Sequence, residues 1–467
     1  MADRVFLLHG WSSNTTTTYG ALRHKLRDAG FDATDLFLGQ YVSLDDNIQL
    51  GDLANALELA LRQHRPGIGA SYHFVTHSTG ALVVRDWLRR HYAPNDRTSK
   101  VGNVVMVAAP QFGSRLAHHG RSMLAGMVKF GDTGREILHA LELGSRHQWG
   151  LADDLIERGA IGPRADARLI CITGDSYEDN RFKKRIFPAA FEDGSDGTVR
   201  TSAANINTRR FRVRIADDAK GQTVAKITAA GEVTNAPFLI LPQYHHVGQK
   251  HGIIGSISQA SNEANHPALR AIADALRVRT RADYNALAAR FAQRVGAITP
   301  EPGSTVTAAS SKRKTFSQVA FRFRTDAGEP IRDYRIELLV EKASGDWASK
   351  TVSHLHINNR DPEVATLFLN YEQFEPHYTY VFRFAAETGT PLVQPVTAEI
   401  AVTGQAVRSI IAAHRTSQID VEIARRPAVQ TAPDEPGLLT FVRSDDPDLE
   451  FEWDRQGRRR KTGRPTA

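Results

Sequence analysis

The chain has 467 residues, which is too many for one ordinary domain, so its length predicts two or three. Hydrophobic residues make up 41% of it and aromatic residues 8%, which excludes a wholly disordered protein. The net charge of +7 does not by itself indicate a nucleic-acid-binding protein, because segment 455–467 contributes six of the seven charges. We expect a solvated basic tail there, and an anionic membrane surface or nucleic acid is the alternative that its charge allows.

The single cysteine, Cys171, excludes an intramolecular disulfide bond. It lies in the apolar run "RLICITG", so we expect a buried small hydrophobe rather than a nucleophile. The first residues, "MADRVFLLHG", lack the features of a secretory signal, and no apolar run is long enough to cross a bilayer. We therefore expect a cytoplasmic protein as synthesised, and export without a cleaved signal stays compatible with these features.

Residues 1–280 alternate short apolar runs with helical patterns. Most of the apolar runs are continuous, as in strands that are buried on both faces of a parallel sheet. This pattern predicts an α/β fold in which helices cover a mostly parallel sheet. The expected strands are Val5–Leu8, Leu36–Leu38, Tyr72–Val75, Val104–Val107, Leu169–Thr173 and Phe238–Leu241. The expected helices include Tyr19–Ala29, Leu50–His64, Gly80–Tyr92 and Pro267–Val278.

The first expected strand runs directly into His9-Gly10-Trp11. An apolar strand that ends in His-Gly can present the backbone N–H of the next residue to an oxyanion, the negatively charged oxygen that forms when a carbonyl is attacked. We therefore expect the N–H of Trp11 to be one donor of an oxyanion hole. A plain turn is the alternative interpretation.

A serine stands at the corner between an expected strand and an expected helix in "FVTHSTGALVVRDWL", residues 74–88. A tight turn at this corner lifts the Oγ of Ser78 clear of the sheet and aims the helix N-terminus at the developing negative charge. The usual pattern of such a nucleophile elbow is G-x-S-x-G, and here Thr76 replaces the first glycine while Gly80 keeps the second. The N–H of Thr79 would be the second oxyanion donor. The alternative is a residue that merely caps an ordinary helix.

Several motifs together resemble the α/β-hydrolases, and within them the lipase and esterase group of bacterial and PGAP1-like lipases. They are "VFLLHGW", "VTHSTGALVVR", "VVMVAAPQFGSRLA", "GSDGTVRTSAANI" and "KHGIIG", all between residues 4 and 280. The resemblance implies an α/β-hydrolase fold and hydrolysis of carboxylic esters with no cofactor. It also implies catalytic residues in the chain order serine, acid, histidine.

That order selects the candidate partners of Ser78. The Asp-Gly-x-Val pattern of the lipases falls on Asp196 in "GSDGTV", so the resemblance implies that this carboxylate orients the catalytic imidazole. The rival acids are Asp175, at the end of "LICITGD", and Asp193. An ordinary Asp-Gly turn is the alternative interpretation.

Three histidines follow the last expected strand in "PQYHHVGQKHGIIG". The histidine of the family usually precedes the last helix, so His251 matches best, and His246 is the alternative. The adjacent pair His245 and His246 could suggest a metal ion, but no spaced carboxylate or cysteine set completes a site. We therefore expect neither a metal nor a cofactor.

Two long insertions interrupt the strand-helix alternation. Residues 113–165 are helical and predict a lid over an apolar pocket, with ordinary core packing as the alternative; residues 209–232 alternate with period two and predict a hairpin. Gln111 and Arg115 are expected beside the pocket mouth in structural roles. The apolar residues that suit a lid are Met123, Leu124, Met127, Val128 and Phe130.

The pattern changes after the catalytic domain, which we place at residues 1–298. Residues 299–315 are rich in Pro, Ser and Thr and predict a linker. Residues 316–404 form alternating strands broken by turns, which predicts a small all-β sandwich. Residues 405–467 are expected to be a polar, partly disordered tail with a basic end.

These features favour a serine hydrolase that cleaves carboxylic esters of lipids, with phospholipase A activity as one option. Trp11 would form an apolar wall at the acyl site, and the basic tail would suit anionic phospholipid. We expect a lipid or acyl-ester substrate, peripheral contact with a membrane, and no nucleic-acid partner. An acyltransferase with the same residues and a catalytically silent binding module are the alternatives from other functional classes.

Overall fold

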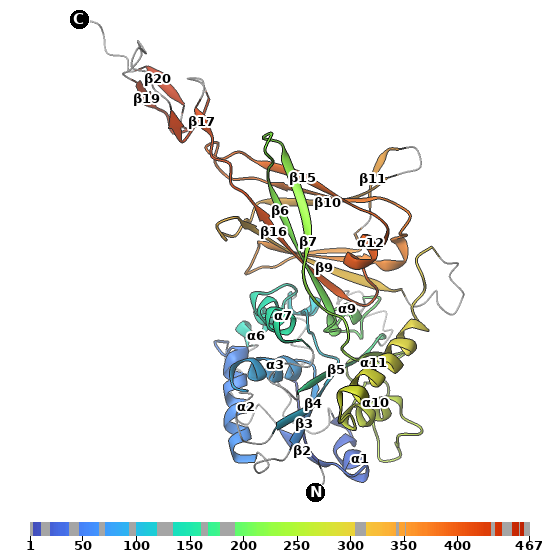
Figure 1. Ribbon diagram of the computed structural model, residues 1–467. Helices are drawn as coiled ribbons and strands as arrows, with labels where there is room; N and C mark the ends of the chain where they lie inside the picture. Colours follow the sequence, from blue (N-terminus) through green and yellow to red (C-terminus); the bar gives the residue numbers. More distant parts are fainter. Residues whose placement is uncertain are drawn as a thin grey trace, which may run out of the picture.

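A six-stranded parallel sheet organises the N-terminal part of the chain in the computed structural model (Figure 1). Its strand order is β2-β1-β3-β4-β5-β8, and neighbouring strands pair in parallel throughout. The inner strands are almost wholly buried, which explains their continuous apolar runs. The strands are β1 (Arg4–Leu8), β2 (Asp32–Leu36), β3 (Ser71–His77), β4 (Lys100–Val107), β5 (Arg168–Gly174) and β8 (Phe238–Leu241).

The structure describes fourteen ranges of the chain, and structural statements below concern these residues alone. Trp11 and the apolar lid residues from Met123 to Phe130 lie outside them, as do residues 304–313 of the expected linker. The described ranges are 3–10, 19–36, 46–64, 71–92, 100–118, 134–159, 167–177, 192–303, 314–341, 345–350, 352–430, 435–440, 451–456 and 458–461.

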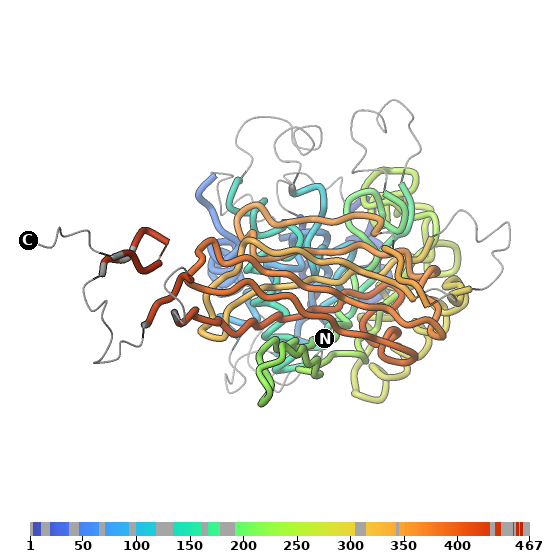
Figure 2. Tube along the Cα trace, turned by 90° about the horizontal axis from the view of Figure 1, so that it is seen from above, coloured from blue at the N-terminus to red at the C-terminus, as the bar shows by residue number. Residues whose placement is uncertain are grey.

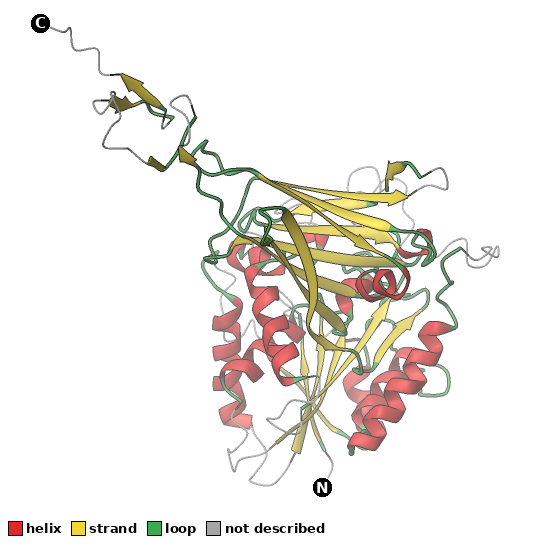
Figure 3. Cartoon of the chain, turned by 45° about the horizontal axis from the view of Figure 1, so that its top comes forward, coloured by secondary structure: helices red, strands yellow, loops and turns green. Residues whose placement is uncertain are grey.

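Helices lie on both faces of the parallel sheet (Figure 3). Apolar residues at helical spacing turn inward from these helices. The start of α7 is capped by Ser145, whose side chain accepts from the N–H of Gln148. One face carries α1 (Leu22–Asp28), α10 (Pro267–Leu276) and α11 (Arg281–Gly296) (Figure 1). The other carries α2 (Leu50–His64), α3 (Gly80–Arg90), α6 (Arg135–Leu141) and α7 (Arg146–Arg158). Two short helices, α4 (Arg115–His118) and α9 (Thr201–Ala204), lie in the connections.

Two further sheets form a β-sandwich that shares one apolar core. The order is β12-β13-β9-β16-β6-β7 in one sheet and β11-β10-β14-β15 in the other. Seen from above, these strands cross over the N-terminal part (Figure 2). The first sheet has β6 (Thr208–Asp217), β7 (Thr223–Val233), β9 (Phe316–Thr325), β12 (His354–Ile357), β13 (Val364–Asn370) and β16 (Thr416–Ile423). The second has β10 (Tyr334–Glu341), β11 (Trp347–Ser349), β14 (Tyr380–Ala386) and β15 (Val396–Val402).

Small elements complete the described part of the chain. A 3-10 helix, η4 (Tyr371–Gln373), and α12 (Gly404–Ile410) border the sandwich. Two short strand pairs project from it toward the C-terminus (Figure 1). They are β17 (Val429–Gln430) with β18 (Leu439–Thr440), and β19 (Phe451–Trp453) with β20 (Arg459–Lys461). No described helix is both long enough and apolar enough to span a bilayer.

Three strands of the sandwich come from segments that we expected to belong to other parts of the protein. The hairpin β6–β7 lies inside the expected catalytic domain, yet β6 pairs in parallel with β16. The strand β16 lies in the segment 405–467, which we expected to be a polar tail, and it is a central strand of its sheet. This strand begins with Thr416, Ser417 and Gln418, which are all buried. The polar residues of this segment therefore lie inside the protein and are not exposed to solvent.

The expected strand at Leu36–Leu38 is also shifted. The structure has β2 at Asp32–Leu36, and residues 37 and 38 lie outside the described ranges. Because β2 is an edge strand, it carries the polar residues Asp32, Thr34 and Asp35 and alternates between buried and less buried positions. A search for continuous apolar runs therefore finds only its end.

Candidate active site

The corner between β3 and α3 forces Ser78 into a left-handed backbone conformation, with a φ of 54°. A non-glycine residue in this region is strained, and such strain is typical of a nucleophile elbow. The turn is held by the N–H of Ser78, which donates to the carbonyl of Val107 at 3.0 Å. A Cβ on Gly80 would lie 2.9 Å from the carbonyl oxygens of Leu8 and His9, so only glycine fits there.

Thr76 occupies the position where the usual elbow has its first glycine. Its side chain is fully buried, and its hydroxyl donates to the carbonyl of Val105 on the neighbouring strand β4 at 3.4 Å. Threonine suits an extended backbone, because its branched side chain fits the pleated surface of a sheet. The departure from the pattern is therefore accommodated within β3 rather than at the turn.

His246 contacts both Ser78 and Asp196. Its Nε2 lies 3.1 Å from the Oγ of Ser78, and its Nδ1 lies 2.9 Å from Oδ2 of Asp196. The backbone N–H of His246 also donates to the carbonyl of Asp196 at 2.8 Å. Since a carboxylate can only accept, Nδ1 carries the proton and Nε2 is left to accept the serine hydroxyl proton. A hydroxyl, an imidazole and a carboxylate thus form one hydrogen-bonded series.

The sequence favoured His251 as the partner of Ser78, with His246 as the alternative. This geometry corrects that choice, because His246 is the histidine that contacts Ser78. The His251 side chain is exposed, and its ring packs against that of His245 with 5.2 Å between centroids. Residues 245–252 double back, because the N–H of His245 donates to the carbonyl of His251 and the N–H of Gly252 donates to that of Gly248. His246 stays close to the end of β8, at the edge of the sheet where Ser78 lies, whereas His251 belongs to the outward turn.

Asp196 is buried, and both of its carboxylate oxygens are occupied. Oδ1 accepts from the backbone N–H groups of Thr198 at 3.0 Å and Val199 at 2.7 Å, while Oδ2 faces His246. These bonds fix the orientation of the carboxylate relative to the imidazole.

The rival acids point elsewhere. Asp175 accepts from the backbone N–H of Gln243, and Asp193 accepts from the hydroxyl of Tyr177 and lies 3.5 Å from Lys314. The structure therefore brings Ser78 together with Asp196, one of the two sequence-selected partners, and replaces the other with the alternative histidine.

Two buried groups near the elbow were not singled out from the sequence. His77 lies next to the serine and donates through Nε2 to the carbonyl of His246 at 3.0 Å. Burial and the nearby His246 lower the pKa of His77 to about 3, so it stays neutral and acts as a fixed donor. Tyr19 donates to the carbonyl of Leu8 at 2.5 Å and packs on the ring of His9. Tyr19 therefore packs against the end of β1.

Gly10, which follows closely after β1, lies directly against the elbow. A Cβ on Gly10 would come within 3.3 Å of the carbonyl of His77 and 3.4 Å of the Cβ of Ser78. Thr79 is buried at the start of α3. Trp11, the other expected oxyanion donor, lies outside the described residues. The placement of the two N–H groups around an oxyanion therefore stays a prediction.

Other residues singled out from the sequence have structural surroundings. Gln111 is buried and accepts from Arg85 at 2.6 Å, and Arg115 pairs with Glu192 at 3.1 Å. Cys171 is buried, and burial raises the pKa of its thiol to about 12, so it remains a protonated hydrophobe as expected. Among the described residues, no group of three or more histidine, cysteine, aspartate or glutamate side chains could hold a metal ion.

Comparisons with known proteins find a strong structural likeness. A family model described as a domain of unknown function, DUF7379, matches residues 2–139. No curated protein matches the sequence. Two structures of the phospholipase PlaB from Legionella pneumophila, one of them in complex with thio-NAD, are each 24% identical and have a TM-score of 0.76. That alignment covers 91% of this chain and 95% of PlaB.

A lipase from Bacillus licheniformis, BlEst2 in its mature form, is 16% identical with a TM-score of 0.34 over 55% of this chain and 88% of its own. The likeness to PlaB shows the fold, and the expected fold class is confirmed. The chain has an α/β-hydrolase fold joined to a C-terminal β-sandwich. The likeness to PGAP1-like lipases stays a prediction.

Proposed function

We propose that this chain is a serine hydrolase that cleaves carboxylic esters of lipids through an acyl-enzyme on Ser78. The observation that carries the proposal is the hydrogen-bonded series from Ser78 Oγ through His246 to Asp196, built on a strained elbow. A hydroxyl needs a base to become a useful nucleophile, and the base needs a partner that holds its tautomer. Each of these parts is present in this series.

The reaction begins when Ser78 Oγ attacks the ester carbonyl carbon while its proton moves to Nε2 of His246. Asp196 stabilises the imidazolium that results. The N–H groups of Thr79 and Trp11 are the expected donors to the oxyanion of the tetrahedral intermediate. The C–O bond of the ester then breaks, and Nε2 returns its proton to the departing alcohol. Water repeats the sequence on the acyl-enzyme and releases the acid together with the original enzyme.

The lipid substrate class rests on apolar features of the chain. Trp11 follows the first strand where an acyl group would lie, and the insertion 113–165 includes five apolar residues suited to a lid. The similarity to a protein that is named a phospholipase supports the same class. A phospholipase A reaction and peripheral contact with a membrane are the specific forms that we propose.

A fluorophosphonate probe and two substrate series test the function. We expect the probe to label the wild-type chain and to leave Ser78→Ala unlabelled, because only an activated serine is phosphonylated. Among p-nitrophenyl esters, octanoyl and longer chains should be cleaved faster than acetyl, and phospholipid vesicles should release fatty acid. Hydrolysis that persists in Ser78→Ala would contradict the proposal. Faster cleavage of the acetyl ester than of the octanoyl ester would indicate a plain esterase.

Acyl transfer to an acceptor other than water would use the same residues. Product analysis with added alcohol or lipid acceptors distinguishes the two reactions, because an acyltransferase forms a new ester at the expense of free acid. A silent binding module would show neither product nor labelling.

A further inference from the structure

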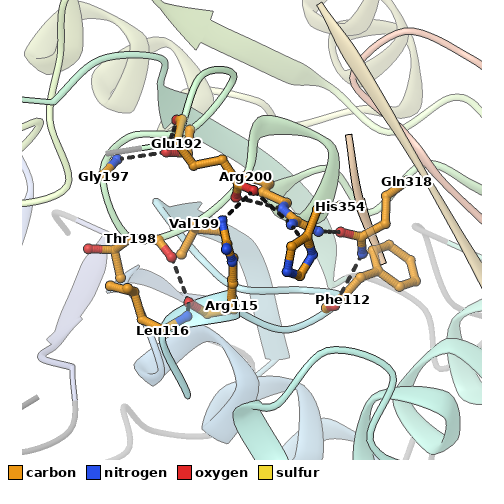
Figure 4. A network of polar contacts seen from close by, with 12 residues as sticks. Phe112, Arg115, Leu116, Glu192, Gly197, Thr198, Val199, Arg200, Gln318 and His354 are labelled. Carbon is orange, nitrogen blue, oxygen red and sulfur yellow. Dashed lines mark hydrogen bonds and ion pairs between the residues drawn. The ribbon is translucent and has the colours of Figure 1, made fainter. Parts of the chain in front are cut away.

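We propose that Arg200 is a positioning residue through which the β-sandwich holds the loop of Asp196 in its working geometry. The inference rests on the proposed function and assigns the sandwich a role in turnover rather than in binding alone. The contacts that carry it span two parts of the chain that lie far apart in sequence (Figure 4).

The first contacts are within the loop itself. The N–H of Asp196 donates to the carbonyl of Val199 at 3.0 Å, and Ser195 and Arg200 form an isolated β-bridge. The N–H of Thr201 donates to the carbonyl of Gly194 at 2.9 Å. Arg200 is therefore the residue at which the tight loop around Asp196 closes. A shift of its backbone would move the two N–H donors that orient the Asp196 carboxylate.

The side chain of Arg200 is anchored on Glu192 at the other end of the same loop. Its Nε lies 2.8 Å from one carboxylate oxygen and its Nη2 lies 2.9 Å from the other, which is a bidentate pair. Burial alone would raise the pKa of Glu192, but the guanidinium groups of Arg200 and Arg115 hold it below its usual value. Ser195 Oγ donates to the backbone carbonyl of Glu192 at 2.6 Å and ties this residue to the loop.

The remaining contacts of the Arg200 guanidinium come from the sandwich. Nη1 donates to the side-chain carbonyl of Gln318 on β9 at 3.1 Å, and Nη2 lies 3.1 Å from Nδ1 of His354 on β12. The guanidinium carbon stacks 3.8 Å from the ring centroid of Phe368 on β13. Side chains from three adjacent strands of one sheet thus contact the guanidinium of Arg200. Figure 4 shows two of them, Gln318 and His354, beside Arg200.

Because Arg200 is buried, its guanidinium depends on these contacts. Arg200 is 2% exposed, and a guanidinium taken out of water must keep its partners, because an unpaired buried charge is strongly destabilising. If the sandwich shifted relative to the N-terminal part, Arg200 would lose its contacts with Gln318, His354 and Phe368. The loop would then have to rearrange to give the buried guanidinium new partners. A displacement of about 1 Å in a catalytic group can lower the rate about a hundredfold.

A second buried arginine supplies a matched control. Arg210 on β6 pairs with Asp153 on α7, donates to Gln418 on β16 at 2.9 Å, and lies over the ring of Trp149. It joins the sandwich to the N-terminal part as Arg200 does, but these contacts involve neither the loop 192–201 nor His246. A loss of activity caused only by a loosened junction should therefore be the same for Arg200 and Arg210.

The experiment compares Arg200→Met and Gln318→Leu with Arg210→Met and Gln418→Leu in the full-length chain. Steady-state hydrolysis of p-nitrophenyl octanoate gives kcat and KM, and circular dichroism reports folding. We expect kcat to fall about tenfold or more in Arg200→Met and about threefold or more in Gln318→Leu, with KM within about twofold. Both control variants should keep kcat within about twofold of the wild type.

A pH profile adds a readout that mere destabilisation would not change. Ser78, Asp196 and the neutral His77 face His246, and a displaced Asp196 would stabilise its imidazolium less. The acid limb of kcat should therefore move to lower pH in Arg200→Met and stay unchanged in Arg210→Met.

Unchanged kcat in Arg200→Met and Gln318→Leu, or equal losses in the control variants, would overturn the positioning role. If Arg200→Met does not fold, Gln318→Leu decides alone, because it leaves the Arg200–Glu192 pair in place. The failure of the proposed function itself has a different signature. The wild-type chain would then show no hydrolysis that depends on Ser78.

Discussion

At the scale of single residues, the loop after β8 offers a direct comparison between two histidines. His246 is buried between Ser78 and Asp196, while His251 is exposed beside His245. We expect His246→Ala to lower kcat by about a thousandfold or more, since the serine then has no base. His251→Ala should stay within about threefold of the wild type, because its ring lies outside the hydrogen-bonded series. Rates of ester hydrolysis measure both, and the opposite ranking would reject the assignment.

The acid can be tested in the same way. Asp196→Asn keeps the shape of the side chain but presents an amide to the imidazole, which favours the tautomer with the proton on the wrong nitrogen. We expect kcat to fall by about three to four orders of magnitude while KM changes little. Asp175→Asn and Asp193→Asn serve as controls, because both carboxylates contact other groups. A large loss in either control, with Asp196→Asn active, would transfer the role to that residue.

The residues of the site differ in how well the sequence identifies them. Ser78 lies on a sharp strand-to-helix corner and Asp196 lies in an Asp-Gly-x-Val pattern, so local chemistry is sufficient for both. The choice between His246 and His251 depends on how residues 245–252 fold back, which no short motif encodes. Distance from the strand end was the usable signal, because His246 follows β8 more closely than His251 does.

At the scale of elements, the elbow needs α3 to start almost in contact with the end of β1. A Cβ at position 80 would lie 2.9 Å from two backbone carbonyl oxygens, which cannot move aside as a flexible side chain can. We expect Gly80→Ala to lower the free energy of unfolding by about 1–3 kcal/mol and to reduce kcat, because α3 carries the turn of Ser78.

Gly296→Ala is the control for that substitution. A Cβ at this position, the last residue of α11, would meet no atom within 4 Å. We expect it to raise the free energy of unfolding by up to about 1 kcal/mol, since alanine restricts the unfolded chain more than glycine does. Urea denaturation of both variants gives the comparison. Equal stability changes at the two sites would contradict the close approach at Gly80.

The elements that could be predicted are those with an unambiguous pattern. Buried parallel strands appear as continuous apolar runs, and β1, β3, β4, β5 and β8 all lie where such runs occur. The position of β6, β7 and β16 in the large sheet of the sandwich could not be predicted in this way. The strands with which they pair are distant in sequence. Thr416, Ser417 and Gln418 are polar although they are buried, so the sequence of β16 resembles that of a solvent-exposed segment.

At the scale of the whole molecule, the two parts meet through buried polar side chains rather than through apolar surface alone. Thr416 donates to the carbonyl of Ser202 at 2.9 Å, and Asn205 donates to the carbonyl of His414 at 2.9 Å. Such bonds make a fixed interface because each buried donor would be costly without its acceptor. The division of the chain into a catalytic domain at 1–298 and a sandwich at 316–404 stays a prediction. The strands β6 and β7 lie within residues 1–298, and β16 lies beyond residue 404, yet all three belong to the large sheet of the sandwich.

His414 makes this interface sensitive to acid. Burial lowers its pKa from 6.5 to about 4, so the folded protein keeps the imidazole neutral while the unfolded chain protonates it. Its Nδ1 lies 3.0 Å from the hydroxyl of Thr201, and its Nε2 has no hydrogen-bond partner among the described residues. A second proton on the ring would therefore have no acceptor there. The stability that His414 contributes is present above pH 6.5 and is lost as the pH falls toward 4.

The prediction is a change in the slope of stability with pH. Between pH 6.5 and about 4 the unfolded state holds one more proton at this site, which lowers the free energy of unfolding by about 1.4 kcal/mol per pH unit. We expect His414→Asn to remove that part of the slope, because asparagine does not titrate and tolerates the left-handed backbone of position 414, where φ is 51°. Urea denaturation at several pH values measures it. His251→Asn, at an exposed histidine, should keep the wild-type slope, and an unchanged slope in His414→Asn would show that this ring is protonated in the folded protein.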